Sequence, residues 1–304
     1  MDKKWAYTHD VLKEDIERLA HDFPDLEWGK IGKSVWGKEI YYIRLGKGEG
    51  KILYNGAHHG MEWITAMLLM KFAREFLEAE RTKTGLGGFS VKALSEKTSL
   101  YIVPMVNPDG VELAARGIPK ELNPGLKAQL IKFNRSENFG RWQANARGVD
   151  LNHNYDGMWD KSKAMEKEYG ISGPGPTRFS GEVPLSEPES RALARFTREH
   201  DFGMVIAFHS QGRVIYQGFQ KKEPQISLKI AQAFEKISPY RIDYTEGIAS
   251  YGGYKDWFVD EFRRPGYTVE VGMGTNPLPT DQLPQIYDDT LPILLGAMTI
   301  PQKI

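Results

Sequence analysis

The 304-residue chain contains no cysteine. This absence excludes disulfide bonds, thiolate-bound zinc, iron–sulfur clusters and cysteine nucleophiles. Histidine is also scarce, with seven residues in the whole chain. Any bound metal ion must therefore be coordinated by His, Asp or Glu side chains, and the small number of histidines leaves few candidates for the nitrogen ligands.

The chain also lacks an excess of either charge and lacks long apolar segments. Lys plus Arg and Asp plus Glu both total 40, which disfavours a surface that follows the phosphates of a nucleic acid. No apolar run approaches the roughly 20 residues that span a bilayer. The charged residues 2–4 do not resemble a secretory leader. These absences predict a cytoplasmic protein with no nucleic-acid partner and no membrane partner.

Short segments rich in Ile, Val and Tyr alternate with helical patterns along the chain. The predicted strands are 39–45, 52–57, 100–106, 202–208, 214–217 and 267–271, and the predicted helices are 8–23, 64–80, 186–200 and 291–298. Ser186 and Glu189 match a capping box at the start of the third helix. This alternation favours an α/β sheet with helices on both faces. No linker-like stretch divides the chain, so we predict one domain over residues 1–304.

The segment His58-His59-Gly60-Met61-Glu62-Trp63 follows a predicted strand and precedes a helix. Residues three apart on a helical turn share a face, so His59 and Glu62 can offer an imidazole and a carboxylate to one ion. A surface histidine beside a glutamate at a helix start is the alternative interpretation. The His-Glu-x-x-His arrangement is absent, so a third ligand must come from elsewhere. His209, at the end of an apolar strand, is the candidate, and a hydrogen-bonded strand-end histidine is its alternative.

Glu270 stands inside the apolar run Tyr267–Val271. A charge in such a place is unfavourable unless it has a partner. It is either an outward glutamate on an edge strand or a carboxylate that faces a cleft as a general base. Two His and one Glu around a metal ion, with one position open to water, form the pattern of a catalytic zinc site. With Glu270 beside that water, the four residues predict metal-assisted hydrolysis.

Five segments in order carry a family resemblance. They are Gly56-Ala57-His58-His59-Gly60-Met61-Glu62-Trp63, Asn107-Pro108-Asp109-Gly110, Gly148-Val149-Asp150-Leu151-Asn152-His153-Asn154, Phe208-His209-Ser210-Gln211-Gly212 and Thr268-Val269-Glu270. Together they resemble the signature of the zinc carboxypeptidase family over residues 5–290. Residues 184–189 and 276–279 resemble its bacterial branch of γ-D-glutamyl-L-diamino-acid endopeptidases. The resemblance implies a single-domain mixed β-sheet with helices on both faces.

The resemblance implies a role for each matching residue. One Zn²⁺ per chain would be bound by His59, Glu62 and His209, with Glu270 as the general base. Asp150 would orient His59, as the neighbours of metal-bound imidazoles usually do. Asn152 and His153 would face the substrate carboxylate. The family usually has Arg at the second of these positions, and its replacement by His153 disfavours capture of a free C-terminus.

The group that stabilises the oxyanion is less well defined by the resemblance. Bacterial relatives often have a basic residue nine positions before the Asn, and here that position is Gln143. Gln143 can donate a hydrogen bond but carries no charge. Arg141 or Arg147 is the alternative source of a cation, and each can equally be a surface arginine of a long loop.

Two further substrate contacts follow from the resemblance. The substrate-capping Tyr of carboxypeptidases aligns with Ile248 in this chain, so nearby tyrosines are the candidates for this role: Tyr244, Tyr251 and Tyr254. Of these, we predict that Tyr251 contacts the substrate. Lys255 aligns with the residue at the floor of the specificity pocket. It would favour an acidic group on the residue after the cut, and its alternative is a solvent-facing helix lysine.

The leading hypothesis is a zinc peptidase that hydrolyses the γ-D-glutamyl–diaminopimelate bond of peptidoglycan stem peptides. The predicted partner is therefore a stem peptide or muropeptide. The first alternative is a metallocarboxypeptidase that removes C-terminal residues from ordinary peptides. The second is a non-catalytic module that binds wall peptides. Recycling of internalised wall peptides, or release on cell lysis or sporulation, would bring a cytoplasmic enzyme to its substrate.

Overall fold

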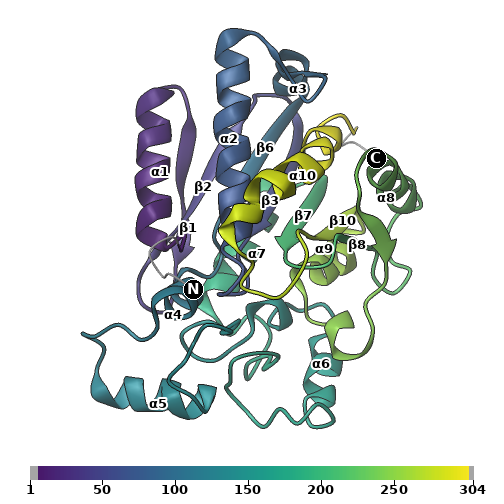
Figure 1. The fold of residues 1–304 in the computed structure, drawn as a ribbon. Coiled ribbons are helices and arrows are strands. Elements are labelled where there is room, and N and C mark those ends of the chain that lie inside the picture. Colours follow the sequence, from purple (N-terminus) through teal and green to yellow (C-terminus); the bar gives the residue numbers. More distant parts are fainter. Residues whose placement is uncertain (1–5, 301–304) are drawn as a thin grey trace.

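The computed structural model describes residues 6–300, so both ends of the predicted 1–304 domain lie outside the described residues. Within this range an eight-stranded sheet has the order β1-β2-β6-β3-β7-β10-β8-β9 (Figure 1). Its strands are β1 (Glu27–Lys33), β2 (Glu39–Leu45), β3 (Gly50–Gly56), β6 (Thr98–Val103), β7 (Met204–His209), β8 (Val214–Gln217), β9 (Arg241–Asp243) and β10 (Gly266–Glu270). A small hairpin pairs β4 (Gly85–Leu86) with β5 (Phe89–Ser90).

The described helices lie on both faces of the sheet and in the loops at one end of it (Figure 1). They are α1 (His9–Asp22), α2 (Ile64–Thr82), α3 (Val91–Lys97), α4 (Pro108–Arg116), α5 (Pro124–Asn134), α6 (Trp159–Met165), α7 (Pro188–His200), α8 (Ile226–Ile237), α9 (Tyr254–Phe262) and α10 (Leu283–Ala297). Helices α1, α2, α8 and α10 contribute to one hydrophobic core, and α7 and α9 to the other.

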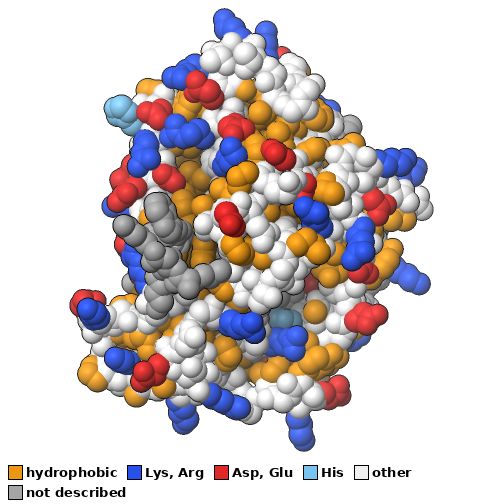
Figure 2. All heavy atoms as spheres, viewed as in Figure 1, with side chains coloured by type: hydrophobic (Ala, Val, Ile, Leu, Met, Phe, Trp, Pro, Cys, Tyr) orange, Lys and Arg blue, Asp and Glu red, His pale blue; other side chains and the backbone are white. Residues whose placement is uncertain are grey.

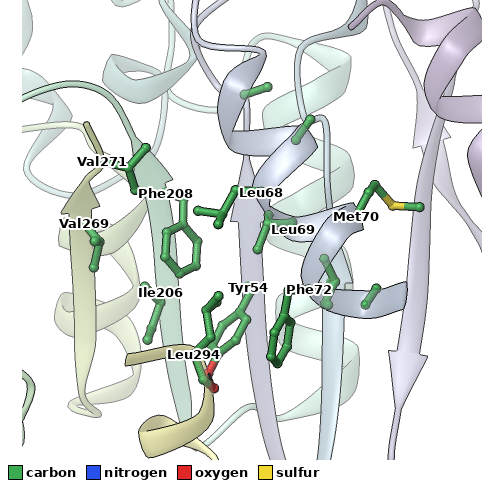
Figure 3. Packing of buried hydrophobic residues seen from close by; sticks show 14 of the residues in the cluster. Tyr54, Leu68, Leu69, Met70, Phe72, Ile206, Phe208, Val269, Val271 and Leu294 are labelled. Atoms are coloured by element: carbon green, nitrogen blue, oxygen red, sulfur yellow. Dashed lines mark hydrogen bonds between the residues drawn. The ribbon is translucent and has the colours of Figure 1, made fainter. Parts of the chain in front are cut away.

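The central strands are apolar on both sides because both sheet faces are covered. In β3, Ile52 and Tyr54 belong to one core cluster and Leu53 to the other, and all three are fully buried. This alternation follows from the two-residue period of a strand. Figure 3 shows Leu68 of α2 beside Phe208 of β7 in the first core. The hydroxyl of Tyr54 donates to the carbonyl of Leu294 at 2.7 Å, which ties α10 to the sheet.

Three parallel neighbours, β3, β7 and β10, end at the same edge of the sheet. Gly56 of β3 is paired with Phe208 of β7, and His209 of β7 is paired with Glu270 of β10. The segment that follows β3 therefore begins beside the strand ends that carry His209 and Glu270. Such an edge is where α/β sheets present functional groups.

The predicted single-domain mixed sheet with helices on both faces is confirmed, since β1, β2 and β8 include antiparallel pairings beside the parallel centre. The predicted capping box is wrong. Helix α7 begins at Pro188 after Glu187, and Glu189 is buried with its carboxylate accepting from the Val35 backbone at 3.0 Å. The last helix begins at Leu283, earlier than the predicted start at residue 291, and Pro292 lies inside it.

The described surface shows no segregation of charge on the face in Figure 2, where Lys, Arg, Asp and Glu side chains of both signs are interspersed. Between residues 6 and 300, no helix combines the length and the apolar character needed to cross a membrane. This finding agrees with the lack of long apolar runs in the sequence.

Replacement of Leu68 by Ala tests the core between α2 and the sheet. Leu68 is fully buried, so we expect the free energy of unfolding to fall by about 2–5 kcal/mol through lost burial and a residual cavity. Urea denaturation followed by circular dichroism measures this change. Leu126→Ala, at a side chain that is 47% exposed, is the matched control and should change the free energy by less than about 0.5 kcal/mol. Equal effects of the two substitutions would contradict the described core.

Candidate metal centre and active-site cleft

Two imidazoles and one carboxylate meet at the sheet edge. Nδ1 of His59 lies 2.9 Å from Oε1 of Glu62, and Nδ1 of His209 lies 3.1 Å from Oε2 of Glu62. Each histidine thus faces a different oxygen of the same carboxylate. One ligand atom from each of the three residues lies within 4.8 Å of the others. The predicted pairing of His59 and Glu62 with a distant His209 is confirmed as a group that could bind one metal ion.

This donor set fits a zinc ion. Zinc accepts His nitrogens and carboxylate oxygens at about 2.0–2.2 Å, so neighbouring ligand atoms in a tetrahedral site lie about 3.4 Å apart. The observed Nδ1–Oε separations of 2.9 and 3.1 Å are close to that value. Burial disfavours a charge on His59, but the negative charges of Glu62 and Asp150 outweigh this and raise its pKa well above the usual range. The site therefore favours a positive charge at the position where a metal ion would take the place of that proton.

The Glu62 carboxylate is held from the loops that follow β7 and β10. Its Oε2 accepts from the Ser210 backbone at 3.2 Å, and Asn276 reaches Oε1 at 3.5 Å and the Ser210 carbonyl at 2.5 Å. Burial alone would raise the pKa of Glu62, but the charge of His59 and the hydrogen bonds of both histidines lower it to about 2. Glu62 is therefore ionised and suited to bind a metal ion, although it is only 3% exposed.

Asp150 connects the metal group to a loop that is remote in sequence. Its Oδ1 lies 3.2 Å from Nε2 of His59, and its Oδ2 accepts from the Arg178 backbone at 2.8 Å. Thr177 also reaches Oδ2 at 3.4 Å. Burial opposes ionisation of Asp150, but the positive charge of His59 and these hydrogen bonds hold its pKa well below the usual range. The contact with the ring nitrogen orients Nδ1 of His59 towards Glu62.

The second motif supports the segment that carries His59. The Asn107 side chain donates to the His58 carbonyl at 2.9 Å and accepts from the Gly110 backbone at 2.9 Å. Gly60 packs against this turn so closely that a Cβ atom there would lie 2.3 Å from the Gly110 carbonyl oxygen. Glycine is therefore required at residue 60 for close backbone approach.

Glu270 lies on an interior strand, between β7 and β8, and not on an edge strand. It lines the same cleft as His59 and His209. Burial, together with the negative charge of Glu62, raises the pKa of Glu270 to about 8. A carboxyl group with such a pKa can both accept and return a proton near neutral pH.

The cleft has a volume of about 780 Å³. Its walls come from the segment after β3, the end of β7, the loops around Asp150, the strands β8 and β10 with α9, and residues 243–249. The residues that line it are His59, Gln143, Asp150, Asn152, His153, Thr177, Arg178, His209, Tyr216, Asp243, Tyr244, Thr245, Glu246, Ala249, Gly253, Lys255, Asp256, Thr268 and Glu270.

The three residues considered for stabilising the oxyanion differ in their position relative to the cleft. Gln143 lines the cleft, and its carbonyl oxygen accepts from the Thr177 hydroxyl, which leaves its amide NH₂ available as a donor. Arg141 and Arg147 are exposed and do not line the cleft of the described chain. Arg147 lies 3.6 Å from Glu187. The structure therefore gives no support to Arg141 or Arg147 as the source of the cation, since both side chains are exposed and neither is among the described lining residues.

The three tyrosine candidates also differ in their burial and in their position relative to the cleft. Tyr244 lines the cleft and is 64% exposed. Tyr254 is fully buried and its hydroxyl lies 2.8 Å from that of Thr197. Tyr251 packs edge-to-face on Phe219 and is not among the cleft-lining residues of the described chain. The choice of Tyr251 as the substrate-facing tyrosine is therefore not supported by its position, and Tyr244 is the one of these three candidates that lines the cleft.

Asn152 and His153 both line the cleft, as predicted for residues that face a substrate. The Asn152 side chain accepts from the Tyr254 backbone at 3.1 Å, which leaves its NH₂ group free of this contact. His153 is buried, with Nδ1 3.2 Å from the Ser162 hydroxyl. Burial lowers the pKa of His153. At neutral pH it is therefore a neutral imidazole and does not replace the positive charge of the arginine found in the family.

Lys255 lines the cleft at the start of α9 and is 5% exposed, which excludes the solvent-facing alternative. Its ammonium donates to the Gly218 carbonyl at 2.8 Å and forms an ion pair with Asp256. Asp256 also lines the cleft. The pocket therefore presents a cation and an anion together instead of the single positive charge expected from the sequence.

Sequence reasoning missed Arg178, Thr177, Asn276 and Asp256. Arg178 and Thr177 follow the loop 173–176, which has no periodic pattern. Asn276 belonged to a recognised segment, but its contact with Glu62 depends on how two loops meet in space. The acidic neighbour of Lys255 was the one available signal, since a buried lysine requires a partner.

A mixed α/β sheet that presents a His-Glu-His group and a perturbed carboxylate in one cleft defines a metal-dependent hydrolase. The family profile described as "Zinc carboxypeptidase" matches residues 12–293. The chain belongs to the zinc carboxypeptidase family and is a zinc carboxypeptidase-type hydrolase.

Curated relatives are similar over nearly the whole chain. "Gamma-D-glutamyl-L-diamino acid endopeptidase 1" of Lysinibacillus sphaericus is 41% identical over 96% of this chain and 72% of its own length. "Uncharacterized protein YqgT" of Bacillus subtilis (strain 168) is 35% identical over 98% of this chain and 78% of its own length.

Solved structures share the fold. The crystal structure of thrombin activatable fibrinolysis inhibitor has a TM-score of 0.73 at 20% identity, over 98% of this chain and 75% of its own. Murein-tripeptide amidase MpaA from Escherichia coli O157 has a TM-score of 0.54 at 21% identity, over 88% of this chain and 91% of its own. At these identities the likeness concerns the architecture of the chain.

Replacement of Asp150 by Asn tests the support of His59. We expect zinc affinity to fall about 10- to 100-fold, because the charged partner of the imidazole is lost while its shape is kept. Competition with a chromophoric chelator measures the affinity. Glu166→Gln is the matched control, since Glu166 holds the Ser180 backbone at 2.8 Å in the adjoining segment without touching His59. An equal loss of zinc affinity in Asp150→Asn and Glu166→Gln would show that the loss results from a changed loop conformation and not from the missing contact with His59.

Proposed function

We propose that this chain hydrolyses the γ-D-glutamyl–diamino acid bond of peptidoglycan stem peptides, with meso-diaminopimelate as the diamino acid. The observation that carries the proposal is the grouping of His59 and His209 around Glu62, at a cleft that both histidines and Glu270 line. The 41% identity over 96% of the chain with an endopeptidase named for this bond supports the choice of substrate. A cytoplasmic location remains a prediction from the sequence.

In the proposed reaction, His59, Glu62 and His209 hold one zinc ion, and Asp150 orients His59. When bound, zinc polarises a water molecule and the scissile carbonyl. Glu270 takes the proton of the attacking water on its carboxylate and returns it to the nitrogen of the leaving amine as the carbon–nitrogen bond breaks. The raised pKa of Glu270, which results from burial and the nearby charge of Glu62, supports this double role.

Neutral donors would contact the reacting group and the substrate carboxylate. Because Thr177 engages the carbonyl oxygen of Gln143, the Gln143 NH₂ group is the donor offered to the oxyanion. Asn152 offers its NH₂ group to a substrate carboxylate. Burial lowers the pKa of His153, and the neutral imidazole lacks the charge with which an arginine binds a terminal carboxylate, so the proposed reaction does not depend on capture of a free C-terminus.

The Lys255–Asp256 pair would bind the far end of the diamino acid. Diaminopimelate ends in an α-amino and an α-carboxylate group, and the pair offers an ammonium and a carboxylate to both of them. Lysine at the same position of a stem peptide has only the amino group. The proposed pocket therefore favours diaminopimelate through a second charge-assisted contact.

Glu270→Gln tests the proposed chemistry. We expect the variant to keep its zinc and to lose at least about 100-fold in kcat on L-Ala-γ-D-Glu-meso-diaminopimelate, because general-base catalysis is removed. Mass spectrometry of the products gives the rate and the cleaved bond, and metal analysis gives the zinc content. Glu246→Gln, an exposed carboxylate of the cleft rim, is the control for loss of charge.

Other outcomes of this assay point to the alternatives. A chelator should abolish hydrolysis by the wild type, and zinc should restore it. Cleavage of α-linked tripeptides at their C-terminus, without cleavage of the γ-linked peptide, would identify an ordinary metallocarboxypeptidase. Binding of the γ-linked peptide without turnover would identify a non-catalytic module.

Replacement of Lys255 by Met, alone and with Asp256→Asn, tests the pocket. The wild type should prefer the diaminopimelate peptide to the matching L-Lys peptide by about 10-fold or more in kcat/KM, as one charge-assisted hydrogen bond predicts. The double variant should lose this preference. The second substitution is included because Lys255→Met alone would leave the buried Asp256 carboxylate without a charged partner. An unchanged preference for the diaminopimelate peptide in the double variant would show that Lys255 and Asp256 do not determine selectivity for the diamino acid.

A further inference from the structure

Arg178 is the cleft-lining cation whose charge is left without a carboxylate partner. Within residues 6–300, the two Lys or Arg side chains that line the cleft are Arg178 and Lys255. Lys255 is neutralised by Asp256. The exposed Arg178 forms no ion pair with a described carboxylate, and its guanidinium lies over the Tyr169 ring at 5.6 Å. An arginine held in this way keeps its planar hydrogen-bonding groups available for an anion.

The backbone of Arg178 is fixed to the metal group. Its nitrogen donates to Asp150, which contacts His59. The preceding residue, Thr177, donates to Gln143, the proposed oxyanion donor. Arg178 has a φ of +64°, in the left-handed region that favours glycine. Such a conformation is unfavourable for arginine and persists where its surroundings enforce it, which is common at ligand-binding sites.

Arg178 and the Lys255–Asp256 pair reach the cleft from different parts of the fold. Arg178 is connected through Asp150 to His59, whereas Lys255 belongs to α9, which packs on β7 and β10. His59 and Glu270, where the proposed reaction takes place, line the same cleft as Arg178 and Lys255. A substrate whose diamino acid contacts Lys255 would place the residue before the cut near Arg178.

The proposed substrate carries an anion at that point. When D-glutamate is linked through its γ-carboxyl group, its α-carboxylate is free and belongs to the same residue as the attacked carbonyl. In an ordinary α-linked peptide the α-carboxyl group itself forms the amide that is cut, so the residue before the cut has no free α-carboxylate. We infer that Arg178 binds the free α-carboxylate of the γ-linked D-glutamate and so makes the cleft selective for this linkage. This inference rests on the proposed function, and Arg178 is a specificity-determining residue in it.

Two peptides that differ in one group test the inference. They are L-Ala-γ-D-Glu-meso-diaminopimelate and the same peptide with the α-carboxylate amidated to D-isoglutamine. We expect the zinc-loaded wild type to prefer the carboxylate form about 10- to 100-fold in kcat/KM, as expected for a charge-assisted pair. Arg178→Gln should bring the ratio close to one, and Arg178→Lys should retain part of it.

Arg135→Gln is the matched control, because Arg135 is also exposed and has a left-handed φ of +54° but lies outside the cleft. It should leave the ratio unchanged. Binding of both peptides to zinc-loaded Glu270→Gln, with and without Arg178→Gln, provides a second measurement that does not depend on turnover. The carboxylate peptide should bind more tightly only when Arg178 is present.

Three results would overturn the inference. The first is a wild type that hydrolyses both peptides equally, which leaves the proposed function standing. The second is an Arg178→Gln variant that slows both peptides by the same factor, which would assign Arg178 to the oxyanion. The third is hydrolysis of neither peptide by zinc-loaded wild type, which would refute the proposed function and the inference together.

Discussion

The buried carboxylate of Glu62, placed between two imidazoles, is the interaction on which the cleft depends. Each of its oxygens faces Nδ1 of one histidine, so His59 and His209 are oriented by a single side chain. The loops after β7 and β10 donate to the same carboxylate. A charge buried to this extent is tolerated only with complete pairing. The strand ends and loops that supply its partners are therefore constrained together.

Charge in the cleft is distributed by local pairing and not by overall composition. Asp150 balances His59, and Asp256 balances Lys255. His153 is neutral because burial lowers its pKa, although it stands where the family usually has arginine. Arg178 is left as the cation without a described carboxylate partner. A chain with zero net charge can thus present a specific arrangement of charges in one cleft.

Sequence patterns were sufficient for the fold class and for the metal group. The strands at 39–45 and 214–217 have the predicted bounds, because apolar β-branched runs between turn residues are strong local signals. The capping box at Ser186 failed since Glu189 is drawn into the core by contacts with residues 35 and 145. The exposed positions of Arg141 and Arg147 could not be predicted, because a loop without periodicity gives no information about the direction of its side chains.

The sequence by itself determined the chemistry available to this protein: nitrogen and oxygen ligands only, a His-x-x-Glu pair after a strand, and a carboxylate in an apolar run. Local order and residue type are sufficient for these conclusions. The tertiary structure alone decided that His209 and Glu270 are paired across neighbouring strands, that Asp256 neutralises Lys255, and that Arg178 enters the cleft. Such contacts join residues far apart in the chain or depend on side-chain direction, and they exist only when packing brings the segments together.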